Sequence, residues 1–101
     1  MNREDLIKIC EQAFVPEDKW RNRDSESAQC QLGECYALLK AGCDFEVVYD
    51  DDICETNEYT IWLYVYSKGF IYFDYAGEKE QHHYYLPTQK RLDEANGGDW
   101  Y

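Results

Sequence analysis

The sequence predicts an α+β fold, with two N-terminal helices packed on an antiparallel three- to four-stranded sheet and a short C-terminal helix. Apolar residues recur with a helical period up to residue 41 and with a strand period after residue 44. Helices that precede a run of strands in this order are typical of two-layer α+β domains. With 101 residues and 45% hydrophobic content, the chain is expected to form a single domain, 1–101, around one modest core.

The first predicted helix begins after Asn2 and ends at Val15-Pro16. The Asn2 side chain can cap it, and Asp5 lies in the first turn, where a negative charge favours the helix dipole. Its apolar stripe follows the spacing of a buried helix face and consists of Leu6, Ile9, Cys10, Ala13 and Phe14.

A polar connection over residues 16–26 holds a basic cluster of Lys19, Arg21 and Arg23, with Trp20 inside it. Two interpretations stay open. Trp20 can fold back over the core while the cations offset nearby carboxylates. Alternatively, Trp20, Arg21 and Arg23 form a contact patch for a partner, because Trp and Arg are frequent at interface hot spots.

The second helix is predicted from about Ser27 to Ala41, with Ser25 or Asp24 as its cap. Gly42 follows at the position where a left-handed glycine commonly closes a helix. The buried stripe of this helix is predicted to consist of Ala28, Leu32, Cys35 and Leu39.

Residues 44–50 and 58–66 are predicted to be strands, because apolar and polar residues alternate in the first and the two faces differ in the second. In the second strand, one face carries Tyr59, Ile61, Leu63 and Val65, and the other carries Thr60, Trp62, Tyr64 and Tyr66. The residues expected in the core lie on the apolar faces of all these elements: Leu6, Ile9, Phe14, Leu32, Leu39, Phe45, Val47, Ile61, Leu63 and Val65.

The remaining elements are weaker in the sequence. Residues 67–69, Ser-Lys-Gly, are predicted to form a hairpin loop that leads into a third strand at residues 70–75. Residues 81–86 are a possible fourth strand, and residues 87–96 a short helix. The aromatic side chains at residues 100–101 indicate that the C-terminal tail docks on another part of the chain.

The chain is strongly acidic, with a net charge of −11 and a pI of about 4.4. Bare DNA, RNA and anionic membranes would be repelled, which disfavours them as direct partners. Between Ala41 and Ser67, seven acidic residues occur without any Lys or Arg: Asp44, Glu46, Asp50, Asp51, Asp52, Glu55 and Glu58. Charge at this density destabilises the compact state, so it indicates a basic partner surface.

Asp44, Glu46, Asp50 and Asp52 would share one strand face if the strand continued to residue 52. Carboxylates at i and i+2 on a strand stand about 6.7 Å apart. This approximates the spacing of successive phosphates along a nucleic-acid strand, so such a row can occupy a groove that normally holds a backbone. The alternative interpretation is a solvated edge strand that uses charge to prevent aggregation.

Trp62, Tyr64 and Tyr66, together with Phe70 and Tyr72, are predicted to form an aromatic strip on the sheet. If the helices cover the opposite face, this strip is the open side of the sheet and resembles an interface. In the alternative arrangement, the C-terminal helix and the tail cover the strip.

No pattern in the sequence indicates catalysis, a cofactor or a metal. The adjacent His82 and His83 would point to opposite faces of a strand, and no CxxC or HxxxH spacing exists. The odd number of cysteines, five, and the lack of a signal-peptide pattern at the N-terminus favour reduced thiols. We therefore expect a non-enzymatic protein of the bacterial cytoplasm that has no cofactor.

In its small size, acidity, tyrosine content and lack of motifs, the chain resembles the inhibitor proteins of bacteriophages and mobile elements, of which the anti-CRISPR proteins are the best known. The resemblance concerns overall character across all 101 residues and rests on no motif. It implies a stoichiometric inhibitor that acts as a nucleic-acid mimic, binding a CRISPR effector where guide or target nucleic acid lies. The acidic segment 44–58 and the residues Trp62, Tyr64 and Tyr66 would then contact the partner. Two alternatives stay open, an acidic immunity protein that neutralises a nuclease toxin and an acidic adaptor module.

Overall fold

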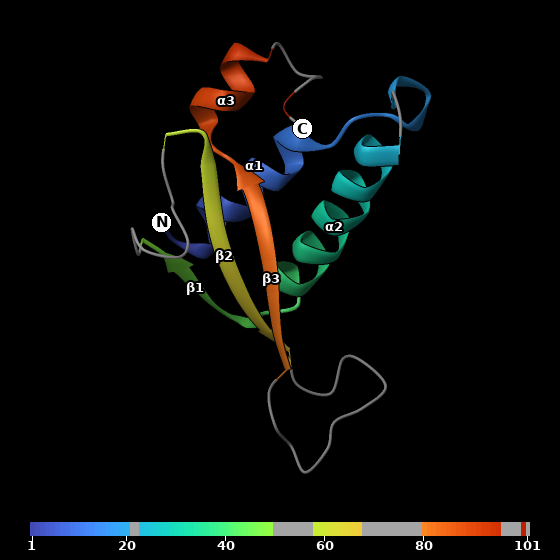
Figure 1. Ribbon diagram of the computed structural model, residues 1–101. Helices are drawn as coiled ribbons and strands as arrows, with labels where there is room; N and C mark the ends of the chain where they lie inside the picture. Colours follow the sequence, from blue (N-terminus) through green and yellow to red (C-terminus); the bar gives the residue numbers. More distant parts are fainter. Residues whose placement is uncertain (21–22, 50–57, 68–79, 96–99, 101) are drawn as a thin grey trace.

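The computed structural model describes residues 1–20, 23–49, 58–67, 80–95 and 100 (Figure 1). It confirms the α+β fold, with two N-terminal helices, a three-stranded antiparallel sheet and a short C-terminal helix. The elements in chain order are α1 (Arg3–Ala13), the 3-10 turn η1 (Glu17–Lys19), α2 (Arg23–Lys40), β1 (Asp44–Val48), β2 (Thr60–Ser67), β3 (Glu80–Pro87) and α3 (Gln89–Glu94).

The central strand of the sheet is β2, which pairs antiparallel with β1 on one side and with β3 on the other. The possible fourth strand at residues 81–86 is therefore real, and it lies beside β2. The predicted hairpin residues Lys68 and Gly69 and the predicted strand at residues 70–75 lie outside the described residues. In Figure 1, α3 continues beyond the end of β3.

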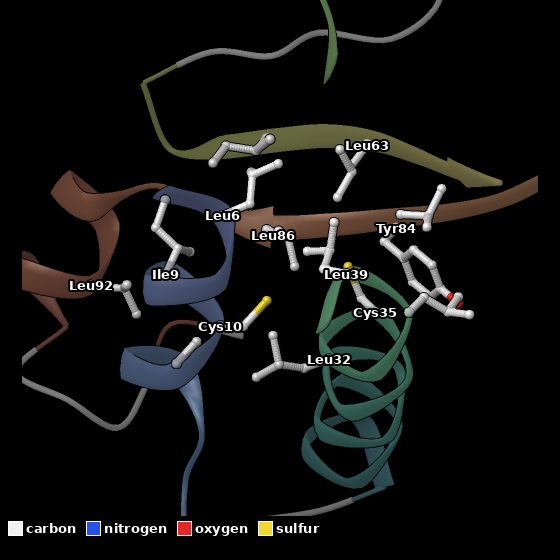
Figure 2. Close-up of a cluster of buried hydrophobic side chains, with 14 of the residues drawn as sticks. Leu6, Ile9, Cys10, Leu32, Cys35, Leu39, Leu63, Tyr84, Leu86 and Leu92 are labelled. Carbon is white, nitrogen blue, oxygen red and sulfur yellow. The ribbon is translucent and has the colours of Figure 1, made fainter. Parts of the chain in front are cut away.

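The hydrophobic core lies between the sheet and the pair of helices α1 and α2, which pack on the same face of the sheet (Figure 2). Of the predicted core residues, seven are buried: Leu6, Ile9, Leu32, Leu39, Ile61, Leu63 and Val65. Phe45 and Val47 are only half-buried, because β1 is an edge strand. Leu38, Cys43, Tyr84, Leu86 and Leu92 complete the core from positions that the core prediction did not include, and Trp100 joins them from the tail.

Phe14 contradicts the core prediction, since 39% of its surface is exposed. The helix α1 ends at Ala13, and Phe14 is its extended C-cap residue, so the helical stripe no longer sets the direction of this side chain. The ring instead packs edge-on against Tyr36 of α2, with the ring centroids 5.3 Å apart. Val15, the next residue, is buried in its place.

The helix α2 begins at Arg23, four residues before the predicted start at Ser27. Ser25, one of the two predicted caps, lies within the first turn and is fully buried. The start was missed because polar side chains occupy the buried face there. Gln29 shows why this is tolerated: its amide donates to the Ala13 carbonyl at 3.1 Å and accepts from the Val15 amide at 3.0 Å. Both ends of the Gln29 side chain are therefore satisfied by the backbone at the end of α1.

The end of α2 follows the prediction. Gly42 has a φ of +89°, in the left-handed region that glycine adopts without a Cβ penalty. The Gly42 amide donates to the Leu39 carbonyl and the Cys43 amide to the Leu38 carbonyl, at 3.1 and 3.2 Å. This pair of bonds is the Schellman motif, which turns the chain directly into β1.

The C-terminal helix is shorter than predicted, because Pro87 completes β3 and Thr88 caps α3 by accepting a hydrogen bond from the Arg91 amide. The prediction that the tail docks is confirmed for Trp100. Its side chain is buried, and its indole N–H donates to the Ala13 carbonyl at 2.8 Å. Trp100 is thus held against the end of α1.

Candidate functional site: an acidic and aromatic face of the sheet

The two faces of the sheet differ in composition, and the face opposite α1 and α2 is the candidate site. We call it the outer face and define it by three rows of side chains: Asp44, Glu46 and Val48 of β1, Trp62, Tyr64 and Tyr66 of β2, and Gln81, His83 and Tyr85 of β3. The inner face carries the alternate residues of the same strands and meets the core.

The strand register joins two features that are separate in the sequence. Asp44 pairs with Tyr66, and Glu46 pairs with Tyr64. Directly paired residues of antiparallel strands project to the same side of a sheet, so the acidic row lies beside the aromatic strip. The predicted acidic and aromatic features therefore form one continuous surface.

The aromatic rings of the outer face pack against one another across the strands. Trp62 meets the Tyr85 ring edge-on, with centroids 4.3 Å apart and an interplanar angle of 80°. Tyr64 meets the His83 ring at 4.4 Å, also at 80°. Trp62 and Tyr64 are themselves 6.2 Å apart. Edge-to-face packing of this kind fixes the rings in place, so they offer a preorganised surface to a partner.

A chain of polar contacts crosses the same face near its acidic end. The Tyr66 hydroxyl donates to the Glu46 carboxylate at 3.2 Å and accepts from the Gln81 amide at 3.2 Å. The Gln81 carbonyl lies 3.2 Å from His83 Nε2. These bonds hold the Glu46 carboxylate in one orientation, although the residue itself is exposed.

The other predicted acidic residues have different placements. Asp44 is exposed at the start of β1, beside Glu46. Glu58 precedes β2, and its carboxylate forms an ion pair with Lys90 of α3 at 2.7 Å, so it has a cation from outside the acidic segment. Four further predicted residues lie outside the described part of the chain: Asp50, Asp51, Asp52 and Glu55.

Sequence reasoning missed the contribution of β3 to this face. The missed residues are Gln81, His83 and Tyr85, of which Tyr85 is 55% exposed. Their alternation with His82, Tyr84 and Leu86 was available as a strand signal. What the sequence did not give was the pairing of β3 with β2, because 12 residues separate the two strands.

His82 and His83 point to opposite faces, as adjacent strand residues do. His82 lies on the inner face, where its Nε2 is 2.8 Å from the Ser67 hydroxyl and its Nδ1 is 3.9 Å from the Glu34 carboxylate. A serine, histidine and carboxylate in this order resemble a nucleophilic triad. However, Ser67 is only 2% exposed, and 3.9 Å is too long for a hydrogen bond. The contacts therefore satisfy buried polar groups and give no substrate access to the hydroxyl.

Within the described segments, no group of three or more His, Cys, Asp or Glu side chains is arranged so that it could hold a metal ion. Cys10, Cys30, Cys35 and Cys43 are free thiols, and Cys54 lies outside the described residues. The neighbouring Cys10 thiol and burial raise the pKa of the Cys35 thiol, which keeps it protonated and unreactive.

The position of Trp20 fits the first of the two interpretations, in which it folds back on the chain. It is half-buried, and its indole N–H donates to the Val15 carbonyl at 2.9 Å, so it folds back on the end of α1. Arg21 lies outside the described residues, and Arg23 forms the first residue of α2.

No protein-family model matches the chain, and no curated protein or solved structure is significantly similar to it. None of the helices in the described residues is both long enough and apolar enough to cross a membrane. The function is therefore argued from the outer face itself.

Proposed function

We propose that this protein acts by stoichiometric binding, with the outer face docked on a basic, nucleic-acid-binding surface of a partner protein. The observation that supports this is the continuity of Asp44 and Glu46 with the packed rings of Trp62, Tyr64 and Tyr85. Aromatic residues provide most of the free energy in many interfaces, and charged residues at the rim set the association rate and the register.

A CRISPR effector is the proposed partner class. Its nucleic-acid channel is positively charged along its length. The net charge of −11 would steer the chain toward such a channel. Asp44 and Glu46, two residues apart on β1, present carboxylates at about the spacing of phosphates, roughly 6.7 Å. Binding there would exclude the guide or target strand without any chemical step.

A nuclease toxin is the second candidate, because it also carries a basic groove for nucleic acid. In that case the chain would be an immunity protein. An acidic adaptor module of a larger complex would use the same face without inhibiting its partner. These three possibilities predict different results in one assay.

The test measures nucleic-acid binding by purified partners in the presence of increasing amounts of the chain. Fluorescence anisotropy of labelled target DNA should fall for at least one CRISPR effector complex and reach its limit at a fixed stoichiometry. A fall for DNase toxins alone would replace the proposal with the immunity function. Unchanged DNA binding in a broad panel of both classes would refute inhibition by nucleic-acid mimicry.

Matched variants then test the outer face. Asp44→Asn with Glu46→Gln should slow association about tenfold at low salt and flatten its salt dependence. Glu17→Gln with Asp18→Asn removes the same charge from the exposed turn η1 and should have a much smaller effect. Equal effects of the two pairs would mean that only net charge matters.

The aromatic contribution is tested with Tyr85→Ala, which should speed dissociation about tenfold or more, because interface aromatics are frequent hot spots. Tyr59→Ala is the matched control, since Tyr59 is also exposed but lies outside the three rows of the outer face. If both variants dissociate at the wild-type rate, the rings of the outer face are not the contact.

A further inference from the structure

A second surface lies along the edge of β3 that is turned away from β2. Two hollows occur there, one of about 420 Å³ between β3 and α2 and one of about 310 Å³ that Thr60, Arg91 and Trp100 also border. The first is bordered by residues 81–84 of β3 and the second by residues 85–87, and Gln31 of α2 borders both. Together they form one groove that follows β3, and each volume is in the range of about 300–1,000 Å³ that is usual for ligand pockets.

The backbone of β3 is available on the groove side. The strand pairs with β2 along its whole length of eight residues. On its other edge it makes no backbone hydrogen bond to another element within the described residues. Alternate residues of an edge strand direct their amide and carbonyl groups outward, where an added strand can pair with them.

Tyr84 provides an independent sign that the groove is incomplete. Its side chain reaches from β3 toward α2 (Figure 2), and it borders the larger hollow. The residue is 4% exposed, and its hydroxyl is a buried polar atom that makes no well-formed hydrogen bond, although the Glu34 carboxylate lies near it. Burial and the nearby Glu34 carboxylate raise the pKa of Tyr84, so the hydroxyl stays protonated and retains a proton to donate. Buried polar groups are usually satisfied, so an unsatisfied one needs an explanation.

The two ends of the groove differ in chemistry. Glu34 and Glu80, both exposed, lie at the end near His82. The other end has an apolar part, formed by Ala28, Leu86, Pro87 and Trp100, and is also bordered by the polar residues Gln31, Thr60, Tyr85 and Arg91. His82 and Leu86 both project from the inner face of β3, four residues and about 13 Å apart. An added strand would therefore place side chains four positions apart at these two ends.

We propose that the groove between α2 and β3 binds an extended peptide segment of a partner protein by strand addition. The segment carries a Lys or Arg beside Glu34 and Glu80 and, four residues away, an apolar side chain in the hollow at Trp100. Backbone hydrogen bonds to β3 provide affinity, and the two end positions provide selectivity. This site adjoins the outer face, with which it shares Gln81, His83 and Tyr85, but it does not depend on the function proposed above.

Charge complementarity favours a basic peptide over a second copy of the chain. Two copies paired through β3 would bring together two chains of net charge −11, each with Glu34 and Glu80 at the contact. A basic peptide reduces this charge instead of doubling it.

The experiment uses displayed seven-residue peptides with Lys and Leu fixed four positions apart and Thr, Val, Ser or Tyr elsewhere. Selection on the full chain should enrich binders, and the same library with Glu in place of Lys should not. Amide chemical shifts of the ¹⁵N-labelled chain should then change along residues 81–87 and not along β1. Absence of saturable binding by any member, or shift changes confined to β1, would overturn the proposal.

The best binder is then resynthesised in two forms. One form carries N-methyl groups on the odd-numbered backbone amides, and the other carries them on the even-numbered amides. One form should lose binding at least about tenfold and the other should not, because only one set of amides faces β3. Equal affinity of both forms would overturn strand addition.

Protein variants complete the test. Gln31→Trp should obstruct both hollows and weaken the peptide about tenfold, whereas Glu26→Trp, at an exposed position about 140° around α2 from Gln31, should not. Glu34→Gln should reduce the preference for Lys, with Glu26→Gln as the matched control on the same helix. A mass that doubles with concentration in light scattering would assign the groove to a second copy and refute the peptide.

Discussion

The two faces of the central strand β2 show how one segment divides stability from recognition. Ile61, Leu63 and Val65 are at most 1% exposed and face the helices. Trp62 and Tyr64, which alternate with them, are half-buried and face the other way. The inner residues are aliphatic and fill a core. The outer residues are aromatic and only partly covered.

This comparison indicates which substitutions should unfold the chain and which should affect only binding. Aliphatic side chains in a closed core stabilise by packing, and their loss leaves a cavity. Aromatic side chains on a half-covered face contribute less to folding than to a later interface. The two sets can therefore be separated by experiment, although they belong to the same eight-residue strand.

The largest effect is expected from Leu63→Ala on the inner face. Leu63 is fully buried between β2 and the helices, so the cavity should lower the free energy of unfolding by about 2–5 kcal/mol. Tyr64→Ala, one residue away on the outer face, should cost only about 1 kcal/mol through its lost contact with His83. Urea unfolding of the two variants measures the difference, and equal midpoints would break the distinction between the faces.

An intermediate effect is expected at the neighbours Tyr84 and Tyr85. Burial raises the pKa of Tyr84 in the folded chain, while in the unfolded chain it titrates near pH 10. Unfolding above about pH 10 therefore releases a proton, and the stability should fall there by up to about 1.4 kcal/mol per pH unit from this residue.

Tyr84→Phe removes that proton and should make the decline above about pH 10 less steep. At pH 7 the variant should remain within about 1 kcal/mol of the wild type, because the lost hydroxyl makes no well-formed hydrogen bond. Tyr85→Phe is the control on the outer face. Chemical denaturation at pH values of about 8, 9, 10 and 11 measures how the free energy of unfolding of the wild type and the two variants changes with pH. Equal pH dependence of all three would contradict a raised pKa of Tyr84.

The smallest effect is expected from Asp44→Asn with Glu46→Gln. Both residues are exposed, and Gln at position 46 retains an oxygen that accepts from Tyr66. The free energy of unfolding should change by no more than about 0.5 kcal/mol, and the change at low salt should be a gain because repulsion is reduced. A large loss of stability would mean that the acidic row is structural, and its effect on a partner would then be indirect.

Local patterns were sufficient for the core of the fold. The alternation from residue 58 to 66 predicted which side of β2 is buried, and the Gly42 position predicted where α2 ends. Both are properties of a short segment, so neighbouring residues determine them. The predicted start of α2 was wrong because Ser25 and Gln29 are polar but buried, and Gln29 is satisfied by backbone atoms of α1.

The candidate site required information that a single sequence does not contain. The acidic residues Asp44 and Glu46 lie far along the chain from Tyr85, and their common face depends on two registers, β1 with β2 and β2 with β3. The apolar alternation of each strand indicates which of its faces is buried, but which strands are neighbours is not a property of any one segment. The continuity of charge and aromatic rings is therefore a tertiary property.

The Ala13 carbonyl has a consequence for the order in which the chain assembles. It accepts hydrogen bonds from Gln29 and from Trp100, the latter across 87 residues of sequence. Closing so long a loop is entropically costly, so this contact forms late. During synthesis α1, α2 and the strands can meet before residue 100 leaves the ribosome, but the core stays open at that corner. The docking of one indole is then the step that closes the core.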